Sequence, residues 1–479
     1  MRVWYKNISL IGIVILTACH FGPQFKAPQP FSNAEIERVL GLSPSAEIHL
    51  PFSPKDFHDS ELNWLMAEAM ESSPDIRTAK ARVEAGRAAH LGTIAGLFPV
   101  ADVVGEYQQE NAGKAVPLRQ NDKVYRAGLN LSWDIDLFGQ KSREIEAASA
   151  TEYQLKAELE HVMVAVVSEV GSAYIGLRTA QYLLKKTHDD LAIQIQLAKL
   201  THDKYKSGLS NAIDVNQADY QVATTRAAIP KLETEIESYQ NTLAILIGQP
   251  AGSLKKRLGQ KDKNLITAPF QFSMKKLSAL PAEVVRYRPD VVGMEAALKA
   301  QNARVGSAVA ELFPTISLSA LFGFESVGLQ HLGKGKTHLQ TYQTSVSAPL
   351  FHFGALWQNV KVEEANMKEA MAMYEKTLLT ATKEIRDILV GLKNMEQRHQ
   401  ELQDAWHKMD TAAKLSRQRY ESGLIDYFQV LNAEERRIAA QAALITSSGA
   451  LYQNILNFYK AVGGQFTFDQ IKSAQTKGQ

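Results

Sequence analysis

The sequence predicts a membrane protein of the α+β class, a tandem-duplicated protomer with four barrel strands and very long coiled-coil helices. Three observations predict this fold class. Short motifs recur at one fixed spacing, two pairs of segments alternate apolar and polar residues, and two proline-free stretches each run for about 67 residues.

Five pairs of segments in this 479-residue chain match at a constant offset of 215 residues. They are SPDIRTAKA from Ser73 with RPDVVGMEA from Arg288, LFPV from Leu97 with LFPT from Leu312, DLFGQ from Asp136 with FHFGA from Phe351, YKSGL from Tyr205 with YESGL from Tyr420, and LIGQ from Leu246 with AVGG from Ala461. A constant offset, with no net insertion between the matched segments, is typical of internal repeats. We therefore expect a first repeat over residues 60–250 and a second over 282–465.

The amino terminus is typical of an export signal. Arg2 and Lys6 precede the apolar run 8–16, which is too short to span a bilayer. The residues before Cys19, the only cysteine, resemble a bacterial lipobox, in which the signal (here 1–18) is removed and the cysteine carries a diacylglycerol. His20, and not an aspartate, follows the cysteine. The resemblance therefore implies that the protein is directed to the outer membrane. The alternative, a general signal cleaved nearby, would leave an unpaired thiol in an exported protein.

The charge balance argues against a nucleic-acid partner. The chain has 53 Lys+Arg and 51 Asp+Glu, and the signal peptide holds two of the bases and no acid, so the mature protein is neutral. Nucleic-acid-binding proteins normally carry a basic excess. After the signal, no stretch approaches the eighteen or so uncharged apolar residues of a membrane-spanning helix. Membrane insertion must therefore come from the lipid or from strands.

Each repeat is expected to begin with a helix, over 60–96 and 282–311, and to continue into a β-hairpin. From Tyr125 to Leu137 the odd positions are apolar and the even positions are polar, which predicts a strand with two different faces. Alternation predicts three further strands, and its parity agrees between the two repeats across the 215-residue offset. The hairpins span 98–138 and 313–353, with polar loops at 111–121 and 327–340.

The two faces of these strands suit a membrane barrel, with the apolar face toward lipid and the polar face toward the lumen. The expected lumen residues are Asp102, Glu106, Arg126, Asp134 and Asp136. The expected aromatic girdles contain Tyr107, Tyr125, Trp133, Phe322 and Phe351.

A very long helix follows each hairpin, over 140–207 and 355–422. In the first, apolar residues recur at steps of three and four, the pattern of coiled-coil packing; they are Leu155, Leu159, Val162, Val166, Val170, Ala173 and Leu177. At about 1.5 Å per residue, each helix is roughly 100 Å long. Each ends at Tyr-x-Ser-Gly-Leu, and return helices follow over 212–247 and 427–462. Pro230 is expected to kink or break the first return helix.

Four strands cannot close a membrane barrel, because small barrels need about eight and an open edge in lipid leaves unpaired backbone groups. The chain must therefore form oligomers. Three chains would supply twelve strands, although these patterns alone do not establish the number.

Several motifs together point to one family. They are LTAC followed by Pro23, Pro28 and Pro30, the repeated LFP, SWDIDLFGQ, the paired YKSGL and YESGL, and RYRPDV. Over nearly the whole chain they resemble the TolC-like outer-membrane factors, most closely the lipoprotein branch typified by OprM. The resemblance implies trimerisation into a 12-stranded outer-membrane β-barrel continuous with a periplasmic α-helical barrel. An equatorial girdle would contain the acylated lead 19–59, the linker 251–281 and the tail 466–479.

The resemblance also implies the function. The chain would be the outer-membrane exit duct of a tripartite efflux system in a Gram-negative bacterium, passively conducting small molecules from an inner-membrane pump of the RND or ABC type and a periplasmic adaptor. It would have no catalytic residues, no metal site and no cofactor beyond the lipid on Cys19. Two alternatives stay open: the duct of a type I protein secretion system, and a lipid-anchored periplasmic coiled-coil scaffold without a pore. The amphipathic strands argue against the scaffold.

Carried over from the family, the Tyr-x-Ser-Gly-Leu turns are periplasmic tips at which the adaptor docks; these residues are Tyr205, Gly208, Leu209, Tyr420, Gly423 and Leu424. The alternative is plain helix termination by the glycines. The periplasmic constriction would contain Phe428, Gln429 and Asn432, with Asp426 and Glu434 nearby. Asn432 stands where relatives have a carboxylate, so an amide ring there would attract cations more weakly. The nearby carboxylates of Asp426 and Glu434 could partly supply the missing charge.

Overall fold

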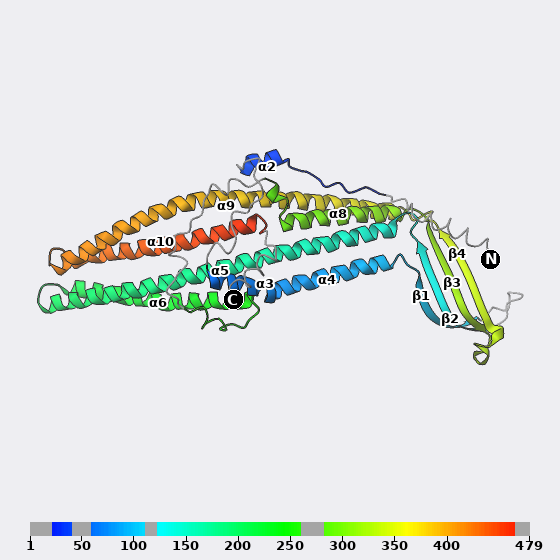
Figure 1. The fold of residues 1–479 in the computed structure, drawn as a ribbon, viewed down its shortest axis with the longest axis horizontal. Coiled ribbons are helices and arrows are strands. Elements are labelled where there is room, and N and C mark those ends of the chain that lie inside the picture. The colour runs from blue at the N-terminus through cyan, green and yellow to red at the C-terminus, as the bar shows by residue number, and fades with distance from the viewer. Residues whose placement is uncertain (1–21, 41–58, 111–121, 260–281, 465–479) are drawn as a thin grey trace. The chain divides into compact units, whose positions relative to one another are not determined.

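The computed structural model describes residues 22–40, 59–110, 122–259 and 282–464 (Figure 1). Cys19, the loop 111–121, most of the linker 251–281 and the tail 466–479 lie outside these ranges. The chain divides into two compact units. The first contains residues 1–28, 82–156 and 293–376, and the second contains 29–81, 157–292 and 377–479.

Helices of the two repeats occur in matched pairs. Helix α4 (Pro74–Ala95) corresponds to α8 (Pro289–Ala310), α5 (Gln140–Lys206) to α9 (Ala355–Glu421), and α6 (Ala212–Leu246) to α10 (Tyr427–Ala461). Within each pair both ends keep the 215-residue offset. The predicted long and return helices agree with these bounds to within one residue.

One antiparallel sheet of four strands lies in the first unit (Figure 1). Its order is β1 (Val100–Glu110), β2 (Asp122–Ile135), β3 (Thr315–Ser326) and β4 (His338–Ser347). Each repeat contributes one hairpin, and the two hairpins join where β2 pairs with β3. In the described chain, β1 and β4 are edge strands. Between β3 and β4, the loop forms two short 3₁₀ turns, η4 (Leu329–His331) and η5 (Gly335–Thr337), and β4 begins inside the range expected to be loop.

Both helices predicted to begin the repeats are interrupted just before a proline. Residues 60–96 form α3 (Ser60–Ser72) and then α4, separated by Ser73, whose ψ is 130°. The second repeat has the 3₁₀ turn η3 (Ala282–Val285) and then α8. The physical reason is that a residue before proline avoids the helical region, whereas proline fits the first helical position.

Pro230, expected to kink or break α6, does not break it, since the helix runs continuously through this residue. The lead contains α2 (Asn33–Leu40). Ser32 and Glu35 begin it with a capping box: Glu35 N donates to Ser32 Oγ at 3.2 Å, and Ser32 N donates to Glu35 Oε2 at 2.8 Å.

The core of the second unit gathers α3 and the middle of α5 with the carboxyl ends of α6 and α10. The predicted seam of α5 is buried at Val166, Val170, Ala173 and Leu177. One 18-residue window of α5 has a mean hydropathy of 1.2 and is 67% buried, so α5 is long and apolar enough to cross a membrane by length and composition alone. The expectation that no such stretch follows the signal is therefore wrong, and packing explains the apolar composition.

Glycines place the end of each return helix against the start of its repeat. A Cβ on Gly248 would lie 2.6 Å from Ser72 O, and one on Gly463 would lie 3.1 Å from Arg288 Cα. Both glycines have positive φ, at 72° and 83°. Arg288 secures the second junction, because its Nη1 donates to Ala461 O at 2.9 Å and its Nη2 pairs with Asp290 and Glu384. The guanidinium thus binds carbonyl and carboxylate groups of three helices.

Candidate functional sites on the sheet and at the helix tips

The sheet has one apolar face and one polar face, and the strand register shows which residues share each. Val103 pairs with Leu129, which also pairs with Phe322. Four of the five predicted girdle aromatics lie on this apolar face, namely Tyr107, Tyr125, Trp133 and Phe322. Phe351 lies beyond the end of β4. The apolar face is exposed in the single chain, with Val103 88% accessible. A face of this composition requires an apolar environment.

The polar face carries an ion-pair cluster at the end of the strands away from the helices. Arg126 of β2 donates from Nη1 to Glu106 of β1 at 2.7 Å, and from Nη2 to Glu325 of β3 at 2.7 Å. Its Nε also donates to Glu325 Oε2 at 3.0 Å. Asp102 lies on the same face, paired in register with Asn130. These predicted lumen residues therefore share one face, and the structure adds Glu325 to them.

Two further predicted lumen residues lie at the opposite end of β2. Asp134 accepts a hydrogen bond from Ser317 Oγ at 2.7 Å and lies 3.6 Å from Lys141 Nζ. Asp136 lies outside the strand, because β2 ends at Ile135. Its carboxylate accepts from the backbone N–H groups of Lys141 at 3.1 Å and Ser142 at 2.8 Å. Asp136 therefore caps the start of α5, and its placement on the strand face was wrong.

Each long helix ends in a Schellman motif at its predicted tip. Gly208 N donates to Tyr205 O at 2.9 Å and Leu209 N to Lys204 O at 2.8 Å, while Gly423 and Leu424 repeat the pattern in the second repeat. The glycines have φ of 73° and 75°, which glycine adopts without strain. The residue after such a glycine usually packs back on its helix. Leu209 and Leu424 instead remain 77% and 73% exposed.

The two motif tyrosines have opposite surroundings. Tyr205 is 47% exposed, whereas Tyr420 is 4% exposed and packs with Leu197, Tyr427 and Val430. The Tyr420 hydroxyl lies 3.0 Å from Thr201 Oγ1. Lys204 Nζ lies 3.9 Å from the Tyr420 ring centroid and donates to the Tyr420 carbonyl. Its burial places the Tyr420 side chain out of reach of a partner, so its prediction as a docking residue is corrected.

The residues expected at the constriction begin α10. Phe428 is 61% exposed, Gln429 is exposed and Asn432 is half-buried. Asp426 is the N-cap residue, and its exposed carboxylate makes no capping hydrogen bond. Glu434 is fully buried between Arg437 Nε at 2.8 Å and Arg417 Nη1 at 3.3 Å. The expectation that Glu434 could supply pore charge is therefore wrong.

Glu434 is one of three consecutive polar residues in the row of buried side chains along α10, called here the α10 seam. The seam runs through Tyr427, Val430, Glu434, Arg437, Gln441 and Ile445, and all six are buried. Arg437 Nη2 pairs at 2.6 Å with Asp190 of α5, which joins the two repeats. Burial raises the pKa of the Asp190 carboxyl despite this pairing. The sequence contains a signal for this network, since charged residues occupy regular seam positions.

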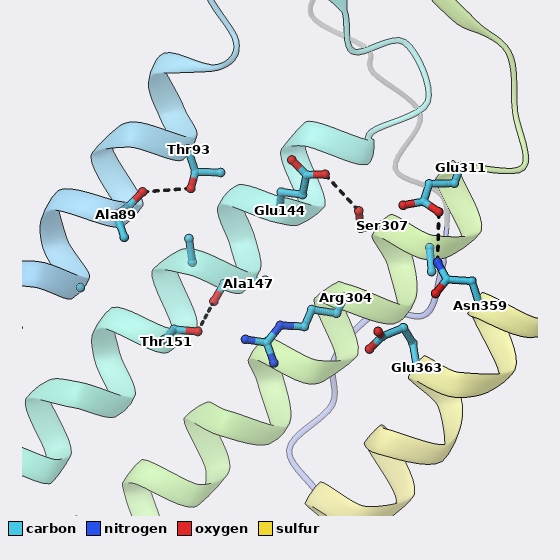
Figure 2. Close-up of a pocket in the computed structure, with 13 residues that line it drawn as sticks. Ala89, Thr93, Glu144, Ala147, Thr151, Arg304, Ser307, Glu311, Asn359 and Glu363 are labelled. Carbon is cyan, nitrogen blue, oxygen red and sulfur yellow. Dashed lines mark hydrogen bonds between the residues drawn. The ribbon is translucent and has the colours of Figure 1, made fainter. Parts of the chain in front are cut away.

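A cavity of about 480 Å³ lies in the first unit among α4, α5, α8 and α9 (Figure 2). Its acidic side chains bond to neighbouring helices. Ser307 Oγ donates to Glu144 at 3.5 Å, and Asn359 Nδ2 donates to Glu311 at 3.1 Å. These contacts connect α5 with α8, and the residue after α8 with α9. Among the described residues, no group of three or more His, Cys, Asp or Glu is placed to hold a metal ion.

The family model of outer membrane efflux proteins matches residues 65–249 and 280–464, two segments related by the same 215-residue offset. The chain belongs to the outer membrane efflux protein family. Two curated relatives are the antibiotic efflux pump outer membrane protein ArpC of Pseudomonas putida, 28% identical over 94% of this chain and 93% of the relative, and the cation efflux system protein CusC of Escherichia coli K12, 26% identical over 96% and 99%. The solved outer-membrane channel OprN is 28% identical, with a TM-score of 0.82 over 93% of this chain and 99% of that structure.

Membership in this family confirms the predicted fold class and the predicted function. Outer membrane efflux proteins are trimeric outer-membrane channels, not enzymes, and they work with a periplasmic adaptor and an inner-membrane pump. The two unpaired edges of the sheet and its exposed apolar face are expected of a single protomer of such a trimer. The family match does not assign roles to the individual tip, constriction and lumen residues.

Proposed function

We propose that this outer membrane efflux protein is the exit duct for small molecules or ions in a tripartite efflux system. One observation carries the proposal: a two-faced sheet with open edges adjoins helices of 67 residues that end in tips with exposed leucines. The sheet supplies a barrel segment and the helices supply a segment of periplasmic length. The relatives named for antibiotic and cation efflux support small cargo over the alternative, a duct for secreted proteins.

Planar-bilayer recording of the purified trimer tests the duct. We expect stepwise conductance, because three sheets close a barrel with a polar interior. Electron microscopy of the same sample should show a threefold hollow rod. A solid or monomeric particle without conductance would reject the proposal. A deletion strain exposed to drugs, metal ions and a secretion assay would identify the cargo, and a defect limited to a secreted protein would favour the type I alternative.

The tips are proposed to dock the periplasmic adaptor through Tyr205, Leu209 and Leu424. Helix termination needs only Gly208 and Gly423 and does not require an exposed leucine after each glycine. Leu424→Asp should abolish complementation of the deletion strain while leaving trimers intact, because the charge cannot be desolvated in an apolar contact. Glu421→Ala is the matched control, since it alters an exposed side chain two residues before Gly423. Full complementation by Leu424→Asp and Leu209→Asp would exclude docking at these leucines.

Cys19 is proposed to carry the covalent lipid. The chain just after it is held against the first unit. Arg143 Nη2 donates to Gly22 O at 3.3 Å, and Asn302 Nδ2 donates to Pro23 O at 3.0 Å. A Cβ on Gly22 would lie 2.6 Å from Gly306 Cα, so the lead packs directly on the α8 backbone. This attachment at the helix ends near the sheet suits a lipid in the adjacent membrane leaflet. Mass spectrometry of the mature amino terminus would test it.

A further inference from the structure

We infer that the charged face of the sheet makes the pore prefer cations, and that the Glu106–Arg126–Glu325 cluster sets how strong this preference is. The inference rests on the proposed duct function. Neither the family match nor the relatives' names specify what determines ion preference in this chain.

The charge imbalance is confined to one face of the sheet. Among the described strand side chains, the polar face carries four acids, Asp102, Glu106, Asp134 and Glu325, against the single base Arg126. The apolar face carries one full charge, Lys123, near the start of β2. The described side chains of each chain therefore add a net charge of about −3 to this face at neutral pH. Fixed charges of one sign that line a pore favour counter-ions.

The residues proposed for the constriction contribute less charge than this face of the sheet. Asn432 and Phe428 are neutral, and Glu434 is buried beside Arg437 and Arg417. Asp426 is the one exposed carboxylate among the residues proposed for the constriction. The sheet therefore holds most of the fixed charge among the described residues assigned to the pore.

The cluster itself forms one row across three strands. Arg126 lies opposite Glu106 on one side and Glu325 on the other. The adjacent row contains Gly128 opposite Gly323, where a Cβ would come within 2.5 Å of backbone oxygen across the strands. Only glycine fits this close approach, so no side chain at these two positions covers the charged row. Its charge is therefore open to permeating ions, and Arg126 offsets half of the negative charge in the row.

The size of the effect follows from geometry. Twelve tilted strands about 4.8 Å apart enclose a cylinder of roughly 12 Å radius. Three charges at that distance change the ratio of cation to anion permeability about threefold at 0.1 M salt and about tenfold at 0.01 M, where the Debye length is longer.

Reversal potentials of the full-length trimer in a KCl gradient test the inference. Arg126→Gln should raise the K⁺/Cl⁻ permeability ratio by about threefold at 0.1 M, and Glu325→Gln should lower it by a similar factor, with larger changes at 0.01 M. Arg126→Lys keeps the charge and should retain the wild-type ratio. Lys123→Gln removes a positive charge from the same strand but from the opposite face, and should also leave the ratio unchanged.

Two outcomes would overturn the inference while leaving the duct intact. One is conductance with the same permeability ratio in Arg126→Gln, Glu325→Gln and the wild type at 0.01 M salt. The other is a shift in Lys123→Gln equal to that in Arg126→Gln, which would make the effect independent of the face. If Arg126→Gln does not assemble, Glu325→Gln decides alone, because it retains the Arg126–Glu106 pair. Absence of wild-type conductance would instead reject the proposed duct.

Discussion

At the residue scale, the two copies of the Tyr-x-Ser-Gly-Leu motif form the same turn but have different surroundings. The backbone turn is the same at both tips, because it depends only on the glycine and on hydrogen bonds within the turn. The tyrosine side chains differ, because Tyr420 packs among helices of both repeats whereas Tyr205 does not. The motif therefore determines the turn, and the tertiary packing determines which side chains a partner can reach.

Tyr420→Ala should lower the free energy of unfolding by about 3–5 kcal/mol per chain, because it leaves a cavity in the small core at the tips. Tyr205→Ala is the matched control at the same motif position. It should change stability by less than about 0.5 kcal/mol, as expected for an exposed side chain. Thermal unfolding in detergent would measure both. Equal effects of the two substitutions would contradict the asymmetry.

Asn432→Asp tests whether the amide of Asn432 lines the constriction. If it does, the variant adds three carboxylates to a narrow ring, and the pore should become several-fold more cation-selective in bilayer recordings. Gln217→Glu is the matched control, since Gln217 is the half-buried counterpart of Asn432 on α6. Strong cation selectivity in the wild type that Asn432→Asp leaves unchanged would show that Asn432 does not line the constriction.

At the scale of elements, α10 combines an apolar seam with a buried charged segment. Asp190, Glu434 and Arg437 lose hydration on burial, and their mutual contacts offset the free-energy cost of this loss. Such a group adds little stability compared with apolar residues, but it fixes which positions of α5 and α10 face each other. We therefore expect it to set the register of the two repeats near their tips.

Arg437→Met should destabilise the protein by about 3–5 kcal/mol, because Glu434 and Asp190 would remain buried without their common partner. The triple variant Asp190→Leu, Glu434→Leu, Arg437→Met should recover most of this loss, since no uncompensated charge remains in the seam. Thermal unfolding of both variants would compare them. A triple variant less stable than Arg437→Met would show that the charges stabilise the fold directly.

Sequence patterns predicted the elements well where a single period dominates. Alternation located all four strands, and the spacing of three and four in a proline-free stretch located α5. The repeat offset then located α9, and the return helices α6 and α10 were placed after the Tyr-x-Ser-Gly-Leu turns. Pro230 was expected to kink or break α6. The helix is not broken there, because a long helix keeps its remaining hydrogen bonds, and the kink stays a prediction.

The site residues show a similar division. Strand parity assigned Asp102, Glu106, Arg126 and Asp134 to one face correctly, because the side-chain period of a strand is two. Parity could not show that β2 ends before Asp136, since a capping carboxylate continues the same alternation. The burial of Tyr420 and Glu434 depends on helices far apart in sequence and could not be predicted from either segment alone.

At the scale of the whole molecule, the duplication places two hairpins in one sheet but leaves β1 and β4 as edges in the described chain. Unpaired edge groups in lipid cost several kcal/mol each, so the chain becomes stable in the membrane only when other copies pair with them. Insertion and trimerisation are thus one process driven by the strands. The lipid proposed on Cys19 would then serve to bring the chain to the membrane.

A variant with a cleavable non-lipid signal and Cys19→Ala therefore should still reach the outer membrane and form trimers, with lower efficiency than the wild type. The substitution would remove the tether of the proposed acyl chains, about 0.8 kcal/mol per buried CH₂, but would leave the apolar strand face and the open edges unchanged. Membrane fractionation and native gels of the two proteins would compare yield and assembly. A variant found soluble and monomeric in the periplasm would show that the lipid, and not strand pairing, holds this protein in the membrane.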